Sequence, residues 1–500
     1  MLFTATTFAF LYLPFVLAGY YLLGRRSPWA AAAWLCAASV FFYGYWMPAF
    51  TLLLLASIGA NFAFGTRIGH ATGPGGRDRA RTPARAWLTA GIVFNLGLLG
   101  YFKYANFFVD NLNAMLGFEW KLARVILPIG ISFYTFTQLA FLVDTWQGKV
   151  KEYRLVHYGL FVSYFPHLVA GPVLHHAQMM PQFANPAVYR FDGANFAAGV
   201  AIFALGLIKK VVLADGIAPY ADAVFVPVDA GSAVAATEAW IGALAYTFQL
   251  YFDFSGYSDM AIGLSWMFNV RLPFNFDSPY RATSISEFWR RWHISLSTFL
   301  RDYLYVPLGG NRKGSVRRYL NLAITMVLGG LWHGAAWSFV LWGALHGAYL
   351  MLNHGLRAAA ARLNWRAVPG ARPVLGAIGW ALTFVAVVVA WVFFRAETLP
   401  GALRVLQGMA GASATGVDPG LLLWNAGLKP EVGLGWCALL GLITLLPANS
   451  NRLGATLHDH LRARASWRTA AGAAALGLSA LIVTLNAARD SVSAFIYFNF

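Results

Sequence analysis

The sequence predicts an all-α membrane protein whose chain crosses the lipid bilayer many times. Of its 500 residues, 59% are hydrophobic and only 11% are charged, whereas charged residues make up roughly 25% of soluble domains. Apolar windows of about 20 residues recur along the chain, and each is long enough to cross a hydrocarbon core of roughly 30 Å. We therefore expect a single integral-membrane domain over residues 1–500, a bundle with about 11–13 spanning or re-entrant helices.

Composition also excludes several classes of protein. The two cysteines, Cys36 and Cys437, both lie in apolar runs, which excludes a disulfide framework and a thiolate metal site. The net charge of +17 indicates basic loops that face an anionic cytoplasmic leaflet. The sequence carries neither zinc-ligand spacing nor an aromatic-basic RNA motif, so we expect no metal, no tightly bound cofactor and no nucleic-acid partner, but contact with membrane lipids.

The N-terminal part predicts spans joined by a basic loop. The first apolar run, residues 4–23, is followed by Arg25 and Arg26, whereas a secretory signal carries its positive charge before the apolar region. We expect a retained span with its N-terminus outside. The loop at 67–85 has five arginines against one aspartate and is predicted to be cytoplasmic. Further spans are expected at 30–45, 48–64 and 86–102.

Two apolar segments in the middle of the chain are irregular. The run at 126–146 contains Pro128 and Gly130, which allow a broken start. The segment at 162–176 is too short and too interrupted by proline and glycine to be a simple span. Irregular backbone at membrane depth must be shielded from lipid, so we expect a re-entrant or protein-buried segment there.

The next two spans end in polar residues. One, at about 193–214, has Lys209 and Lys210 near its end, and another, at about 236–252, runs into a stretch where Asp253 and Asp259 interrupt the apolar pattern. These aspartates are expected to fix a broken helix through local hydrogen bonds. The alternative is that one of them orients a histidine.

A basic amphipathic helix is predicted to begin at Ser284. Ser284 with Glu287 forms a capping-box pattern, and apolar residues recur at helical spacing as far as residue 303. Such a helix lies in the interface plane, and His293 would be on its polar face. The surrounding stretch 281–318 holds eight Arg or Lys against two acidic residues, which predicts the cytoplasmic side. The polar face comprises Ser286, Arg290, His293, Ser297 and Arg301.

His333 is the leading candidate for chemistry. The apolar run at 319–353 would be roughly 50 Å long as one helix, so we expect a break near Gly329–Gly330 or His333–Gly334. An ionisable residue at membrane depth is a functional candidate, and histidine suits proton transfer near neutral pH. The alternative is a hydrogen-bonded packing residue, which is the interpretation given to His346. The last spans are expected near 375–394, 433–447 and 469–488.

Five motifs of the chain are distinctive: LPIGISFYTF (127–136), YFPHLVAGPV (164–173), DFSGYSDMAIG (253–263), the block at 279–312 and LWHGAAW (331–337). In these motifs the sequence resembles the membrane-bound O-acyltransferases, and within them the bacterial alginate O-acetyltransferase branch. One departure is visible: relatives often have an arginine after the AGP motif, where this chain has His175 and His176. A metal site at that pair is a weaker alternative.

The resemblance implies an acyltransferase-type helical bundle with a central funnel. It implies His333 as the catalytic histidine and His293 as the supporting one. The expected reaction transfers an acetyl group from a cytoplasmic thioester, acetyl-CoA, across or through the bacterial inner membrane. There the group serves for O-acetylation of an extracytoplasmic polysaccharide such as alginate. Cellulose, peptidoglycan and teichoic acid are alternative acceptors, and a periplasmic SGNH-type O-acetyltransferase is the expected partner.

The substrate contacts are less defined. The basic stretch at 281–318 is either a docking surface for a phosphate-bearing donor or a consequence of membrane topology alone. Beyond that stretch, Trp332 and Asp253 are candidates for binding substrate. The docking residues would be Arg290, Arg291, Arg312 and Lys313.

The C-terminal FIYFNF is similar to the tail motif of small partner peptides in the teichoic-acid D-alanylation system. Tyr497 is therefore either an acyl relay or an interface anchor. A different class of function also fits parts of the pattern: broken helices with buried ionisable residues suit a transporter or flippase of an envelope-polymer precursor. The lack of an evident internal repeat argues against that alternative.

Overall fold

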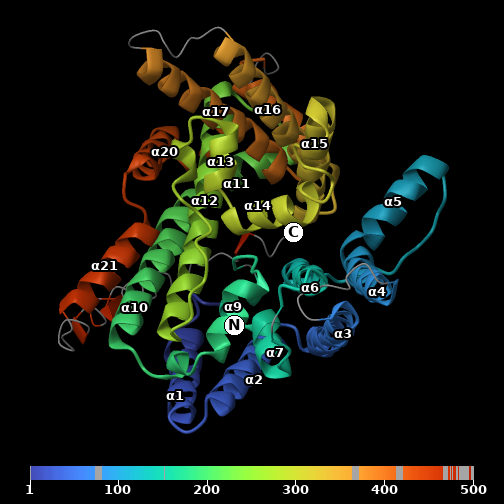
Figure 1. Cartoon of the computed structure of the whole chain (residues 1–500). Coiled ribbons are helices and arrows are strands. Elements are labelled where there is room, and N and C mark those ends of the chain that lie inside the picture. Colours follow the sequence, from blue (N-terminus) through green and yellow to red (C-terminus); the bar gives the residue numbers. More distant parts are fainter. Residues whose placement is uncertain are drawn as a thin grey trace. The chain divides into compact units, whose positions relative to one another are not determined.

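The computed structural model describes residues 2–73, 82–150, 152–169, 171–362, 371–412 and 420–464, with scattered positions between 471 and 496. All regular secondary structure within these ranges is helical (Figure 1). The chain divides into two compact units. The first comprises Met1–Leu207, Tyr257–Phe274 and Ser450–Asp490, and the second comprises Ile208–Gly256, Asn275–Asn449 and Ser491–Phe500.

The first unit is built largely from apolar helices. Proline at the first helical position favours helix initiation, and Pro28 and Pro48 start α2 and α3 in this way. Within the unit, α1 packs against α2, and α3 packs against both α4 and α6. The described helices are η1 (Phe8–Tyr12), α1 (Leu13–Gly24), α2 (Pro28–Trp46), α3 (Pro48–Thr72), α4 (Thr82–Leu99), η3 (Gly100–Tyr104), α5 (Ala105–Leu116), α6 (Ile131–Trp146), α7 (Leu155–Ser163), α8 (Phe165–Leu168), α9 (His176–Ala184), η4 (Pro186–Tyr189), α10 (Gly193–Ile208) and α21 (Ser450–Arg464).

The second unit contains the antiparallel pair of α15 and α16, which bears His333. Glycine lets the two helices approach closely: a Cβ on Gly330 would lie 2.2 Å from the Phe339 carbonyl oxygen, and one on Gly343 would lie 2.4 Å from that of Met326. The described helices are η5 (Lys209–Ala214), α11 (Asp215–Asp229), α12 (Ala236–Met267, which continues into the first unit), η6 (Pro279–Arg281), α13 (Ile285–Arg291), α14 (Ile294–Leu300), η7 (Arg301–Tyr305), α15 (Gly314–His333), α16 (Trp337–Arg362), α17 (Ala371–Arg395), α18 (Leu399–Met409), α19 (Leu421–Asn425) and α20 (Pro430–Leu445).

The predicted polytopic all-α fold is confirmed. Four described segments are long and apolar enough to cross a membrane, and a bent pair, Pro430–Leu445 with Ser450–Ala463, would be a fifth. The expectation of about 11–13 segments also counted shorter and re-entrant helices, so it is a different quantity from this number of long apolar helices. The four are Pro48–Thr72, Thr82–Leu116, Gly193–Asp229 and Pro373–Arg395.

Several local predictions are confirmed. Helix α6 begins only at Ile131, after Gly130 with φ +78°, as the broken start at Pro128 and Gly130 predicted. The irregular segment at 162–176 contains the end of α7, the four-residue helix α8 and a non-helical stretch at 171–175, and nearly all its described residues are buried. The long run at 319–353 breaks after His333, because Gly334 is extended (φ −160°, ψ 152°).

Other predictions are wrong. The stretch at 253–259 is not a helix break, because α12 runs without interruption from Ala236 to Met267. The span predicted to end near Lys210 continues through η5 into α11. The single amphipathic helix from Ser284 to residue 303 is divided in two, because His293 adopts a left-handed conformation (φ +43°) between α13 and α14. The expected span at 469–488 lies mostly outside the described residues.

Candidate active site

His333 is the last residue of α15 and lies in an aromatic enclosure of the second unit. His333 is only 3% exposed. The imidazole centroid is 5.0 Å from that of Trp332, 5.1 Å from that of Trp342 and 5.1 Å from that of Phe394. These rings come from α15, α16 and α17, so three helices fix the position of the imidazole.

His293 is also buried, which corrects the prediction that it lies on the polar face of a surface helix. The residue is 0% exposed, and its ring packs edge-on against Phe254 with centroids 4.8 Å apart. A left-handed conformation is uncommon for residues other than glycine, and it persists only where the surrounding structure imposes it. Here the backbone N–H of Ile294 donates to the Asn275 carbonyl oxygen at 2.9 Å, which fixes the turn.

Asn275 determines the tautomer of His293. Its side-chain oxygen accepts hydrogen bonds from the Ser295 backbone N–H at 3.2 Å and from the Ser295 hydroxyl at 2.8 Å. The same oxygen lies 3.2 Å from His293 Nδ1, so Nδ1 donates. Nε2 then carries the lone pair, and it has no hydrogen-bond partner within the described part of the chain. Burial lowers the pKa of the His293 imidazole to about 3, so the ring is neutral near pH 7.

Trp332 brings the two histidines together. Its ring centroid is 5.0 Å from that of His333 and 6.2 Å from that of His293, although the histidines are forty residues apart in the sequence. The structure therefore assembles His333, His293 and Trp332 into one cluster. A buried, neutral imidazole beside a second one can accept a proton from a reacting hydroxyl group.

His346 and Asp253 lie in other surroundings. His346 is buried between aromatic rings and accepts a hydrogen bond at Nδ1 from the Trp289 indole N–H at 3.3 Å. The Asp253 carboxylate is bound by Lys210 at 2.8 Å and by the backbone N–H of Ile496 at 2.9 Å. These contacts give Asp253 a role other than the local hydrogen bonding that we predicted. Sequence reasoning missed Lys210, because a lysine after an apolar run ordinarily marks the end of a span.

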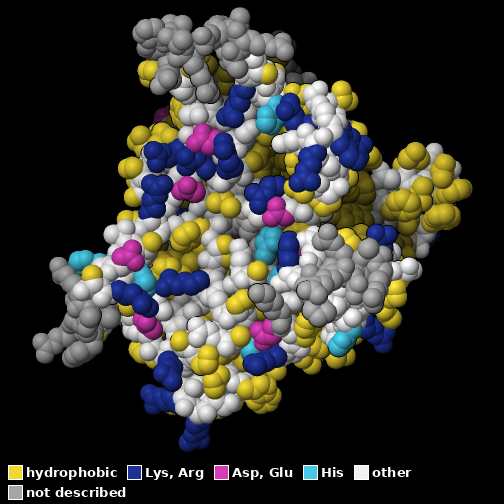
Figure 2. All heavy atoms as spheres, viewed as in Figure 1, with side chains coloured by type: hydrophobic (Ala, Val, Ile, Leu, Met, Phe, Trp, Pro, Cys, Tyr) yellow, Lys and Arg dark blue, Asp and Glu magenta, His cyan; other side chains and the backbone are white. Residues whose placement is uncertain are grey.

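The predicted donor-docking residues differ from one another in exposure. Arg291 is held by Glu287 at 2.9 Å and lies 3.6 Å from Asp277, so two carboxylates within the protein balance its charge. Arg290, Arg312 and Lys313 are exposed. Figure 2 shows Lys and Arg side chains gathered over the region of α13 and α15. The predicted helix start is confirmed in part: Ser284 Oγ accepts from the Glu287 N–H, but the Glu287 carboxylate accepts from Thr283.

The tail is described only at Phe495 and Ile496, which are both buried. The Phe495 ring lies 5.8 Å from the Phe254 ring, and Phe254 in turn contacts His293. Ring contacts therefore connect the C-terminal segment to the histidine cluster. Tyr497 lies outside the described residues.

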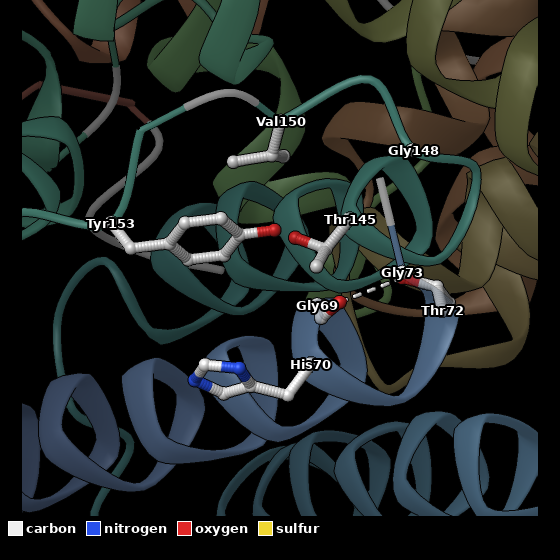
Figure 3. A pocket seen from close by; sticks show the side chains of 8 residues that line it. All are labelled: Gly69, His70, Thr72, Gly73, Thr145, Gly148, Val150 and Tyr153. Carbon is white, nitrogen blue, oxygen red and sulfur yellow. Dashed lines mark hydrogen bonds between the residues drawn. The ribbon is translucent and has the colours of Figure 1, made fainter. Parts of the chain in front are cut away.

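The first unit has cavities of its own. One of about 330 Å³ opens beside the end of α3 (Figure 3), where the Tyr153 hydroxyl and the Thr145 side chain point toward each other. A second, of about 430 Å³, is lined in part by Lys149, Glu152 and His176. His176 Nδ1 is 2.9 Å from the buried Asp144 carboxylate. The first cavity is lined by Gly69, His70, Thr72, Gly73, Thr145, Gly148, Val150 and Tyr153.

Comparison with known proteins decides the family. Residues 132–394 match the membrane-bound O-acyltransferase family, a range that includes both histidines and Trp332. The chain belongs to this family. The acyltransferase is 42% identical over 438 residues to the "Peptidoglycan O-acetyltransferase" of Helicobacter pylori, which covers 82% of this chain and 80% of the relative.

The acyltransferase is also similar to two further relatives. It is 47% identical over 414 residues to the "Probable alginate O-acetylase AlgI" of Azotobacter vinelandii, which covers 82% of this chain and 78% of the relative. Identity to the "Teichoic acid D-alanyltransferase" of Streptococcus thermophilus is 27% over 291 residues, or 53% of this chain and 68% of the relative. The protein is thus a multi-pass membrane O-acetyltransferase, as the motifs predicted.

Proposed function

We propose that this O-acetyltransferase moves an acetyl group from acetyl-CoA on the cytoplasmic side toward the hydroxyl groups of an envelope polysaccharide, with His333 as general base. The observation that carries the proposal is the pair of buried histidines, His333 and His293, in contact with the same Trp332 indole. Relatives named for alginate and peptidoglycan O-acetylation support a polysaccharide acceptor, and alginate is the acceptor we favour.

The chemistry needs a base because a hydroxyl group keeps its proton at neutral pH. The His333 imidazole removes that proton while the hydroxyl oxygen attacks the thioester carbonyl carbon. The carbon–sulfur bond then breaks, the electron pair leaves on sulfur, and the thiolate takes up the proton from the imidazolium. A positioned base of this kind contributes about 10²–10⁴-fold to the rate.

His293 supports the reaction from beside Trp332. Its Nδ1–H is committed to Asn275, and its neutral Nε2 can accept a hydrogen bond from a substrate hydroxyl or amide group. Because burial lowers the pKa of His293 to about 3, this nitrogen stays an acceptor throughout the physiological pH range. His293 therefore orients the substrate while His333 transfers the proton.

The donor binds at the exposed basic surface of the second unit. Acetyl-CoA carries phosphate groups, and Arg290, Arg312 and Lys313 are exposed cations on this surface. Arg291 acts indirectly, since its ion pairs with Glu287 and Asp277 fix the end of α13. We expect acetyl-CoA binding at this surface to weaken as salt concentration rises, because exposed charges are screened.

The acetyl group leaves through the C-terminal tail. Tyr497 follows Ile496 directly, and the Phe495 ring packs on Phe254 beside His293. The Tyr497 phenol is then the hydroxyl group that attacks the thioester carbonyl carbon: His333 takes its proton and the thiol departs. The resulting phenyl ester is a good acetyl donor for a periplasmic SGNH-type transferase, which passes the acetyl group to the polysaccharide. The protein would thus act at the bacterial inner membrane with a partner that selects the polymer.

The test uses full-length protein in lipid nanodiscs with acetyl-CoA labelled in the acetyl group. We expect thioester cleavage to fall about 10²–10⁴-fold in His333→Ala. His346→Gln is the matched control, since His346 is equally buried in the same unit among aromatic rings. Tyr497→Phe should abolish acetylation of the polymer in cells, and normal acetylation in that variant would dispose of the relay.

Two outcomes would contradict the proposal. Equal rates in His333→Ala and the unsubstituted protein would remove His333 as the base. Movement of a polysaccharide precursor into proteoliposomes that contain the protein, without thioester cleavage, would instead identify a transporter.

A further inference from the structure

A lysine buried between two aspartates lies in the second unit, and the reaction described above does not use it. Lys210 Nζ is 2.7 Å from Asp215 Oδ1 and 2.8 Å from Asp253 Oδ1. The three side chains are 4%, 8% and 1% exposed. A charged group inside a membrane protein is expensive and is usually retained for a function.

The local backbone is built to form this cluster. In an α-helix with 3.6 residues per turn, residues five apart point about 140° away from each other, so Lys210 and Asp215 could not meet. Between them lies the π-helical turn η5, in which the Asp215 N–H donates to the Lys210 carbonyl oxygen. This wider turn brings the two side chains to the same side, and π turns of this kind are frequent at functional sites.

Two carboxyl groups of the cluster face one ammonium group. A buried carboxyl oxygen needs a hydrogen-bond donor, because an unsatisfied polar group is costly in a buried site. The remaining Asp253 oxygen, Oδ2, accepts a hydrogen bond from the Ile496 backbone N–H at 2.9 Å. Nearby, the Phe495 ring packs on Phe254, the residue after Asp253. The C-terminal segment therefore supplies a donor to the carboxylate that Lys210 holds in place.

We propose that Asp253, held by Lys210, is the anchor that fixes the C-terminal segment inside the second unit and so sets the position from which Tyr497 acts. Asp253 and Lys210 are positioning residues in this arrangement, because they act through the tail. The role of Tyr497 rests on the proposed function, whereas the anchoring of Ile496 does not.

The cluster provides its own matched control. Asp215 and Asp253 bind the same lysine at nearly the same distance, and among the described residues the tail contact, from the Ile496 N–H, is made to Asp253. Asp215→Asn and Asp253→Asn each remove one negative charge beside Lys210 and leave the other carboxylate in place. A cluster that served stability alone would respond similarly to the two substitutions.

The experiment measures how readily the tail leaves its site. In full-length protein with Cys36→Ser and Cys437→Ser, Ile496→Cys introduces a thiol at a position that is 9% exposed. Its rate of reaction with a water-soluble maleimide is compared in nanodiscs. We expect Asp253→Asn to raise the rate about tenfold or more, since loss of a charge-assisted hydrogen bond is worth a factor of this size. Asp215→Asn should leave the rate within about twofold.

Equal labelling rates in the two variants would overturn the anchor. Thermal unfolding of both variants shows whether they are folded, and Lys210→Arg, which keeps the charge, should restore slow labelling relative to Lys210→Met. Polymer acetylation is measured separately. Faster labelling in Asp253→Asn with unchanged acetylation would support the anchor and contradict the relay through Tyr497.

Discussion

Buried histidines occur in both units, but their ring nitrogens are used differently. In the first unit, His176 Nδ1 binds the Asp144 carboxylate and its Nε2 lies 3.4 Å from the Lys149 carbonyl oxygen. His157 Nδ1 likewise contacts the Glu152 carboxylate. In the second unit, His293 binds an amide oxygen through Nδ1, and Nε2 has no hydrogen-bond partner among the residues described.

The difference separates a structural histidine from one available for chemistry. A ring whose two nitrogens both have protein partners is held in place but has no site left for substrate. His293 is held equally firmly through one nitrogen while the other can still accept a hydrogen bond. Neither burial nor an open nitrogen identifies a reactive histidine by itself, since His346 Nε2 also has no hydrogen-bond partner among the residues described. What distinguishes His293 is an open nitrogen together with a place beside Trp332 and His333.

The largest effect expected from this difference between the two units is on the rate of acetyl-CoA cleavage. His293→Ala should lower acetyl-CoA cleavage about 10²-fold, because it removes the imidazole proposed to accept a hydrogen bond from the substrate beside Trp332. His176→Ala should lower the rate per folded molecule less than about tenfold, because His176 takes no part in proton transfer. Initial rates divided by the amount of folded protein provide the measurement, and a larger loss in His176→Ala would reverse the contrast.

A substitution at the histidine–carboxylate pair of the first unit should affect the stability of the fold more than the rate. Asp144→Ala removes the carboxylate partner of His176 and Lys149, and a buried polar group left without its partner costs about 1–3 kcal/mol. We expect a lower thermal unfolding midpoint in detergent with little change in the rate of the folded enzyme. An unchanged midpoint would mean that the pair in the first unit is not structural.

Asn275 links structure to chemistry in the second unit. Asn275→Ala removes the acceptor that fixes the His293 tautomer and that also binds Ser295. We expect about a tenfold lower rate, which corresponds to one hydrogen bond of ordinary strength. Asn275→Asp keeps an acceptor oxygen and should retain more activity; equal losses in the two variants would show that the tautomer is set elsewhere.

The smallest effect is on the pH dependence of stability. The pKa of His293 is lowered to about 3 in the folded protein, against about 6.5 when unfolded. Below pH 6.5 the unfolded chain binds the extra proton, so this residue makes the fold less stable as pH falls from 6.5 toward 3, by at most about 1.4 kcal/mol per pH unit. Above pH 6.5 it has no effect. Unfolding midpoints between pH 8 and 5 should fall less steeply in His293→Gln.

The sequence predicted the features that depend on local pattern. Ser284 begins a helix because its hydroxyl accepts a backbone N–H three residues on, and the break after His333 follows from a run too long for one span and rich in glycine. The family motifs identified the chemistry, and the comparisons bear out that assignment.

Features that depend on distant contacts were not predictable. The left-handed turn at His293 needs Asn275, eighteen residues earlier, so helical periodicity gave a continuous amphipathic helix instead. Lys210 looked like the end of a span because its partner Asp253 is 43 residues away, on α12. Asp253 in turn looked like a helix breaker, since an apolar pattern gives no sign of a lysine that will meet it.

The end of α15 at His333 has a further electrostatic consequence. Aligned peptide dipoles give the C-terminus of a helix roughly half a unit of negative charge, and the ring of His333 is attached to the last helical residue. The interaction of this field with the ring is weak while the ring is uncharged and favourable once the ring has gained a proton. In the proposed transfer the helix would thus favour the short-lived imidazolium, without needing a carboxylate in the aromatic enclosure.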